Sequence, residues 1–158
     1  MPDVKILPAG PDDAGELLTL QYAAYLSEAR LYGRLDLPPL VQTIDSLLAD
    51  FDTTTWKKAV HRGRIVGAIR ARRDGGVLHV GRLMVAPDRQ GEGIGTRLLA
   101  AVEDEMPGDV GKLALFTGHL STANLRLYER HGYREIRREP GGTGVMLVHL
   151  EKTVAPAG

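Results

Sequence analysis

The chain has 158 residues, of which 43% are hydrophobic, enough to bury one substantial core but too few for a second full domain. Twenty basic side chains balance twenty acidic ones, so no basic excess indicates a nucleic-acid partner. The absence of cysteine excludes disulfides, a thiolate nucleophile and cysteine-ligated metals. No apolar run approaches the ~20 residues that span a bilayer, and the first residues do not resemble a signal peptide, so we expect a cytoplasmic protein without a membrane partner.

The first half of the chain is predicted to begin with a strand and two helices. Val4 to Leu7 has the pattern of a strand, and Asp12-Asp13 is a suitable acidic cap for the helix that follows. Arg30 to Pro39 is a polar connection containing glycine and proline, and Leu40 to Leu48 is predicted to be a second, shorter helix.

Three consecutive antiparallel strands are predicted next. They cover Thr54 to Val60, Ile65 to Arg72 and Val77 to Val85, because apolar residues alternate between turn sequences. His61 to Arg64 and Asp74 to Gly76 supply those turns.

The second half continues the alternation of helices and strands. It is predicted to contain, in order, a helix ended by Pro107-Gly108, a strand from Leu113 to Thr117, a helix from Ala123 to Arg130 capped by Ser121-Thr122, and strands from Tyr133 to Arg138 and from Val145 to Leu150. The sequence therefore indicates one α/β domain over residues 1–152, with about seven mostly antiparallel strands and about four helices. Residues 153–158 are expected to form a loose tail.

A glycine-rich turn between a strand and a helix is the most informative motif. Gly91, Gly93 and Gly95 alternate directly after the strand that ends at Val85. Glycine allows close approach of an anion, and the free N–H groups at a helix start favour a phosphate. The spacing differs from the G-x-G-x-x-G dinucleotide fingerprint, and a Walker loop would require a lysine that this turn lacks. The turn therefore predicts a diphosphate site of another kind.

Two motifs together resemble those of the GNAT acyltransferase superfamily. Residues 90–95 (QGEGIG) match its Q/R-x-x-G-x-G/A motif, which binds acetyl-coenzyme A, and residues 124–133 (NLRLYERHGY) are similar to its N-x-x-x-Y-x-x-x-G-F/Y motif. The order of predicted elements over residues 4 to 150 also fits that family. The resemblance implies a sheet whose fourth and fifth strands splay apart near a bulge in the fourth, with the coenzyme held between them.

The resemblance also implies which residues hold acetyl-CoA as cosubstrate. The backbone of Leu83 and Val85 would pair with the pantetheine arm, and the N–H near Leu83 and Met84 would polarise the thioester carbonyl. The diphosphate would be held by the guanidinium of Arg89, the Thr96 hydroxyl and the amides of a run comprising Gln90, Gly91, Glu92, Gly93, Ile94, Gly95 and Thr96.

Tyr128 is the residue that the resemblance implies as general acid, close to the coenzyme sulfur. A phenol with a pKa near ~10 can share a proton with a thiol near ~8.5. Asn124 is implied either as a contact of the pantetheine arm or as a cap of the local helix.

The general base is less strongly indicated. A substrate ammonium with a pKa near ~10 must lose a proton before it attacks. His79 lies where relatives often carry a glutamate or histidine, and Glu28 lies in the segment expected to shape the acceptor pocket. His119 is a weaker third candidate, and no histidine shows metal-ligand spacing, so no metal is expected.

The function implied by the resemblance is an acetyl-CoA-dependent N-acetyltransferase that acts by direct attack of an amine on the thioester. An acyl-CoA-binding sensor without turnover is the alternative, and an O-acyltransferase also remains open. The acceptor, a small-molecule or peptide amine, has no recognisable motif. Many relatives dimerise through their C-terminal strands, so a homodimer is one expected state.

Overall fold

A computed structural model describes residues 3–142 and 144–154. A seven-stranded sheet in the order β1-β2-β3-β4-β5-β7-β6 forms its centre. The strands are β1 (Lys5–Ala9), β2 (Thr55–His61), β3 (Arg64–Asp74), β4 (Val77–Val85), β5 (Lys112–Gly118), β6 (Arg134–Pro140) and β7 (Met146–Thr153). The helices are α1 (Ala14–Tyr32), α2 (Pro38–Val41), α3 (Ile44–Asp50), α4 (Ile94–Asp104) and α5 (Thr122–Arg130), with short 3₁₀ turns at η1 (Pro11–Asp13) and η2 (Pro87–Arg89).

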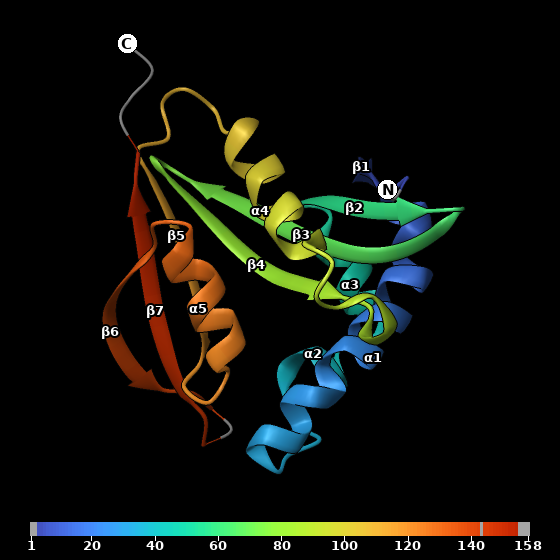
Figure 1. The fold of residues 1–158 in the computed structure, drawn as a ribbon, viewed down its shortest axis with the longest axis horizontal. Helices are drawn as coiled ribbons and strands as arrows, with labels where there is room; N and C mark the ends of the chain where they lie inside the picture. The colour runs from blue at the N-terminus through green and yellow to red at the C-terminus, as the bar shows by residue number, and fades with distance from the viewer. Residues whose placement is uncertain (1–2, 143, 155–158) are drawn as a thin grey trace.

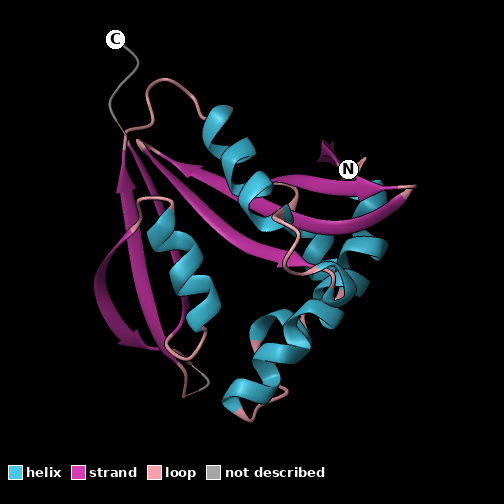
Figure 2. Cartoon of the chain, in the orientation of Figure 1, coloured by secondary structure: helices cyan, strands magenta, loops and turns pink. Residues whose placement is uncertain are grey.

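The helices cover both faces of the sheet. Helices α4 and α5 lie on one face, and α1 to α3 lie on the other (Figures 1 and 2). Every neighbouring pair of strands is antiparallel except β4 and β5, which are parallel. The predicted mixed, mostly antiparallel sheet is confirmed.

The region after α1 differs from the sequence prediction. Helix α1 continues to Tyr32 and ends where Gly33 adopts a left-handed conformation with φ of 63°. The single helix predicted over Leu40 to Leu48 is instead two short helices, because Thr43 leaves helical geometry and its side chain caps α3 by accepting from the Ser46 N–H. The described residues thus hold five α-helices rather than about four.

The three-strand meander follows the prediction closely. Strands β2 and β3 are joined by Arg62 and Gly63, both with positive φ (51° and 78°), as a two-residue type I′ hairpin turn requires. Strand β4 begins and ends at the predicted residues, Val77 and Val85.

Helix α4 packs unusually close to β3, and this fixes the position of its N-terminus. A Cβ at Gly67 would lie 2.9 Å from Cγ2 of Ile94 and 3.1 Å from the carbonyl oxygen of Met84. Leu98 and Leu99 complete the contact and are fully buried. Only glycine at position 67 therefore lets the first turn of α4 lie against the sheet.

Two remaining predictions concern the ends of the chain and the membrane. Thr153 belongs to β7, and residues 155–158 of the expected tail lie outside the described residues. None of the helices described in 3–142 and 144–154 is long and apolar enough to cross a bilayer.

Candidate active site

Strands β4 and β5 start side by side and then diverge, as Figure 1 shows. Their parallel pairing covers only three positions and ends at His79 opposite Ala114. Beyond His79, the edge of β4 that faces β5 has no strand partner among the described residues. The backbone groups of this edge are therefore available to another extended molecule.

A β-bulge in β4 lies beside this opening. Gly81 pairs with Arg70 and Met84 pairs with Ala68, so three steps along β4 match two along β3. The extra residue is accommodated by Arg82, whose φ is 48°. Such a conformation is uncommon for a residue with a side chain and concentrates at functional sites.

A cavity of about 830 Å³ opens between the diverging strands and helix α1. It brings together five of the residues that the sequence indicated for the site. These are Glu28, His79, Leu83, Asn124 and Tyr128. They come from α1, β4 and α5, so the fold gathers side chains that are up to 100 positions apart.

The glycine-rich loop lies outside this cavity and leads into α4. Gly91 and Gly93 have φ values of 81° and 83°, and a Cβ at either position would meet nothing within 4 Å. The loop backbone is thus open to a ligand at the start of α4, as a diphosphate site requires. Gly95 differs, because a Cβ there would lie 3.6 Å from the side chain of Leu127 and 3.8 Å from that of Val85.

Arg89 is already paired within the loop. Its guanidinium donates to the carboxylate of Glu92 at 2.9 to 3.0 Å and contacts Nδ1 of His61 at 2.9 Å. The hydrogen bond to Glu92 raises the pKa of Arg89 and, in turn, lowers that of Glu92. A bound diphosphate would therefore compete with Glu92 for this guanidinium.

Tyr128 is the most buried of the candidate catalytic residues, with 6% of its surface exposed. Its ring meets that of Tyr133 edge-on, with the centroids 6.0 Å apart. Burial raises the pKa of the Tyr128 phenol above its ordinary value. The group therefore keeps its proton at neutral pH.

Asn124 lies inside the first turn of α5 and does not cap it. The N-cap position is occupied by Ser121, whose side chain makes no capping bond. The Asn124 amide instead reaches the hydroxyl of Thr117 on β5 at 3.5 Å.

Glu28 is held by a hydrogen-bond network that joins α1 to the β5–α5 loop. Its carboxylate accepts from the hydroxyl of Ser121, which is also 2.8 Å from the Tyr32 hydroxyl. Tyr32 in turn accepts from the backbone N–H of Leu120 at 3.0 Å. His79 differs from Glu28, because within the described residues its ring has no hydrogen-bond partner.

The cavity also contains residues that the sequence analysis did not select. They include Tyr25, Arg70, Arg82, Phe116 and His149. For one of them a signal was present, since Arg82 interrupts the apolar alternation Leu78, Val80, Met84 in a strand. A charged residue in the buried phase of a strand indicates either a bulge or a function.

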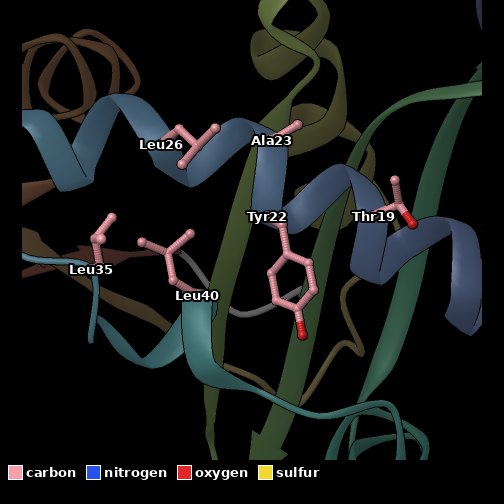
Figure 3. A pocket seen from close by; sticks show the side chains of 6 residues that line it. All are labelled: Thr19, Tyr22, Ala23, Leu26, Leu35 and Leu40. Carbon is pink, nitrogen blue, oxygen red and sulfur yellow. The ribbon is translucent and has the colours of Figure 1, made fainter.

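A second hollow, of about 490 Å³, lies between α1 and the segment that follows it (Figure 3). Its walls are mainly apolar, with Leu26, Leu35 and Leu40 gathered on one side. The hydroxyl of Tyr22 donates a hydrogen bond to the backbone carbonyl of Gln42. This hollow carries no acid, base or anion site, so the larger cavity is the candidate active site.

The chain belongs to the GNAT acetyltransferase domain family, whose model matches residues 42–154. Among solved structures it is similar to the PaiA N-acetyltransferase of Thermoplasma acidophilum in complex with coenzyme A, with a TM-score of 0.76 and 15% identity over 96% of this chain and 99% of that one. It is also similar to the ribosomal-protein-S18-alanine N-acetyltransferase of Escherichia coli, with a TM-score of 0.80 and 17% identity over 98% and 96% of the two chains. At these identities, the two likenesses show the fold.

One curated relative is longer than this chain. The UPF0157 protein YqkA of Bacillus subtilis (strain 168) is 27% identical over 134 residues, which is 85% of this chain and 38% of that protein. The chain thus spans less than half the length of this relative.

Proposed function

We propose that this protein transfers an acetyl group from acetyl-CoA to a primary amine by direct attack. The observation that carries the proposal is the divergence of β4 and β5 after His79, which leaves an unpaired strand edge beside a cavity containing Tyr128. A thioester arm laid along that edge would gain backbone hydrogen bonds and present its carbonyl to the cavity.

The coenzyme would lie along β4 and over the glycine-rich loop. The backbone of Leu83 and Val85 would hold the pantetheine arm, and the N–H groups at Leu83 and Met84 would stabilise the oxyanion. The loop amides from Gln90 to Thr96 would hold the diphosphate. The positive φ and open surroundings of Gly91 and Gly93 fit this group.

The reaction requires one proton to leave the amine and one to reach the sulfur. The amine nitrogen attacks the thioester carbon, and collapse of the intermediate breaks the C–S bond and releases the CoA thiolate. The buried phenol of Tyr128 would protonate that thiolate. Because burial raises the pKa of Tyr128, transfer would be favourable only to a thiolate whose own pKa is also raised by burial.

Glu28 and His79 are the two candidate bases, and both line the cavity. Glu28 is fixed in place by Ser121, which suits a group that holds the incoming ammonium. His79 lies at the point where the strands separate, and its ring, which has no hydrogen-bond partner among the described residues, is able to accept a proton directly or through water.

Release of free CoA thiol from acetyl-CoA across a panel of amines tests the proposal. The chain has no cysteine, so the protein adds no thiol background to a colorimetric assay. Amine-dependent release supports an acetyltransferase. Saturable binding of acetyl-CoA by calorimetry without release with any amine would instead favour the acyl-CoA-binding module, and absence of binding would defeat both.

A further inference from the structure

The floor of the cavity carries more positive than negative charge close to the bulge. Arg70 and Arg72 of β3 and Arg82 of β4 line it, and Arg137 lines the opposite wall on β6. The chain as a whole has no net charge, so this concentration is local.

Arg82 differs from the other three arginines in the burial of a polar atom of its guanidinium group. Its Nε is buried without a hydrogen-bond partner, and no ion pair within residues 3–142 and 144–154 includes it. A buried guanidinium nitrogen without a partner is costly, as is the φ of 48° that places it there. A ligand that supplies an acceptor would offset the first cost.

The acidic side chains nearby do not fill that role. Asp50 pairs with Arg70 at 2.7 Å and also accepts from the Gln42 amide at 2.9 Å. Burial lowers the pKa of Arg70, and the charge of Arg82 lowers it further, so the two guanidinium groups act on each other. Asp50 is thus engaged by Arg70, and among the described residues no ion pair joins it to Arg82.

Glu28 and Arg82 both lie close enough to Tyr25 for their charges to affect its pKa. Burial raises the pKa of the Tyr25 phenol, the positive charge of Arg82 lowers it, and the negative charge of Glu28 raises it further. The cavity thus presents one group suited to an ammonium and another suited to an anion, both close to Tyr25.

We propose that the acceptor is an amine whose molecule also carries a carboxylate or phosphate group, and that Arg82 binds this anionic group. This inference rests on the proposed acetyl transfer. Arg72, which has no ion-pair partner among the described residues, supplies a second donor on the same floor. Amines that carry only positive charge, such as polyamines, meet repulsion from Arg82 and bind poorly.

The test uses matched pairs of amines that differ in the anionic group alone. O-phosphoethanolamine is compared with ethanolamine, and β-alanine with β-alaninamide, which also separates phosphate from carboxylate recognition. Each is titrated by calorimetry into CoA-saturated protein. We expect the anionic member of at least one pair to bind about tenfold or more tightly, the effect of one charge-assisted hydrogen bond.

Three variants assign that preference to Arg82. Arg82→Gln keeps a Cβ at the strained position and removes the charge, and we expect the preference to vanish. Arg82→Lys keeps the charge and retains part of the preference. Arg30→Gln, on the exposed surface of α1 outside the cavity, leaves it unchanged.

The possible failures are distinguishable. Equal affinity within every pair, no measurable binding of either member, or a preference that survives in Arg82→Gln overturns this inference while leaving acetyl transfer intact. If the wild-type protein does not bind acetyl-CoA at all, the proposed function is itself wrong.

Discussion

The carboxylate of Glu28 accepts a hydrogen bond from the hydroxyl of Ser121, and this contact ties helix α1 to the loop that precedes α5. The two residues are 93 positions apart in the chain. Ser121 is 3% exposed and its hydroxyl also lies 2.8 Å from that of Tyr32, so the bond is shielded from solvent. It also sets the position of a candidate base.

Ser121→Ala tests the structural part of this relationship. The substitution leaves Glu28 and the Tyr32 hydroxyl without their shared partner, so we expect the free energy of unfolding to fall by about 1–2 kcal/mol. Denaturant unfolding measures the change. Thr122→Ala, at the exposed neighbouring position, is the matched control and should shift the midpoint much less. An equal effect of the two variants would contradict the role of the Ser121 hydroxyl.

Gly93→Ala tests the diphosphate loop. At a φ of 83° an added Cβ costs about 1–2 kcal/mol of backbone strain, and it also enters the space where the diphosphate is expected. We expect calorimetric affinity for acetyl-CoA to fall at least tenfold. Gly63→Ala supplies the control, because Gly63 has a similar φ of 78° in the β2–β3 turn. It should lose comparable stability and keep its affinity; a loss of affinity in both would point to a general folding defect.

Tyr128→Phe tests the proposed general acid. Removal of the phenol hydroxyl should lower turnover by about 100-fold or more with little change in acetyl-CoA affinity, since only the proton donor is lost. Tyr133→Phe is the control, because the neighbouring ring is equally well buried but its hydroxyl donates to Glu103. That variant should lose stability and keep its turnover. Unchanged turnover in Tyr128→Phe would remove Tyr128 from the role.

Local patterns in the sequence were sufficient to predict most of the sheet. The meander from β2 to β4 was foreseen almost residue for residue, because alternation and turn chemistry act over a few positions. The break between α2 and α3 was not, since the propensity of Leu40 to Leu48 favours one helix and the capping by Thr43 overrides it.

The candidate site was predicted only where a linear motif marks it. Glu28 was selected from its place in the chain, but its contact with Ser121 depends on how α1 crosses the diverging strands, which no short pattern encodes. Arg82 was missed because strand periodicity assumes regular pleating. The bulge changes which face of the sheet is occupied by the residues that follow Gly81. The sequence motif also gave no indication that Arg89 pairs with Glu92 within the loop.

The pH dependence of turnover tests which residue is the base. A base must be deprotonated to act, so turnover should fall as pH decreases through its pKa in the wild type. Replacing the true base removes the acidic limb of the pH profile, which is the fall in turnover at low pH, and lowers the turnover reached at higher pH. We therefore expect one of Glu28→Gln and His79→Gln to abolish the limb and the other to preserve it. If both variants keep the wild-type profile, neither residue is the base.

Asp88 links the entrance of the glycine-rich loop to the start of β3, and its contribution to stability depends on pH. Hydrogen bonds from Arg64, at 2.7 and 2.8 Å, lower the pKa of Asp88 to about 2. Because the folded-state pKa lies below the unfolded value of about 3.9, the pair stabilises the fold above pH ~4 and loses this effect as pH falls through about 2. Both side chains are exposed, so the effect is small.

Asp88→Asn should accordingly lower the thermal midpoint slightly at pH 6 and by much less near pH 2, where about half of the wild-type carboxylate is itself protonated. Differential scanning calorimetry at the two pH values measures the difference, and added salt should reduce it because the charges are exposed. Asp52→Asn, at an exposed aspartate without an ion-pair partner among the described residues, controls for the loss of one charge. A midpoint difference that is as large at pH 2 as at pH 6 would mean that the Asp88 side chain acts through packing and not through its charge.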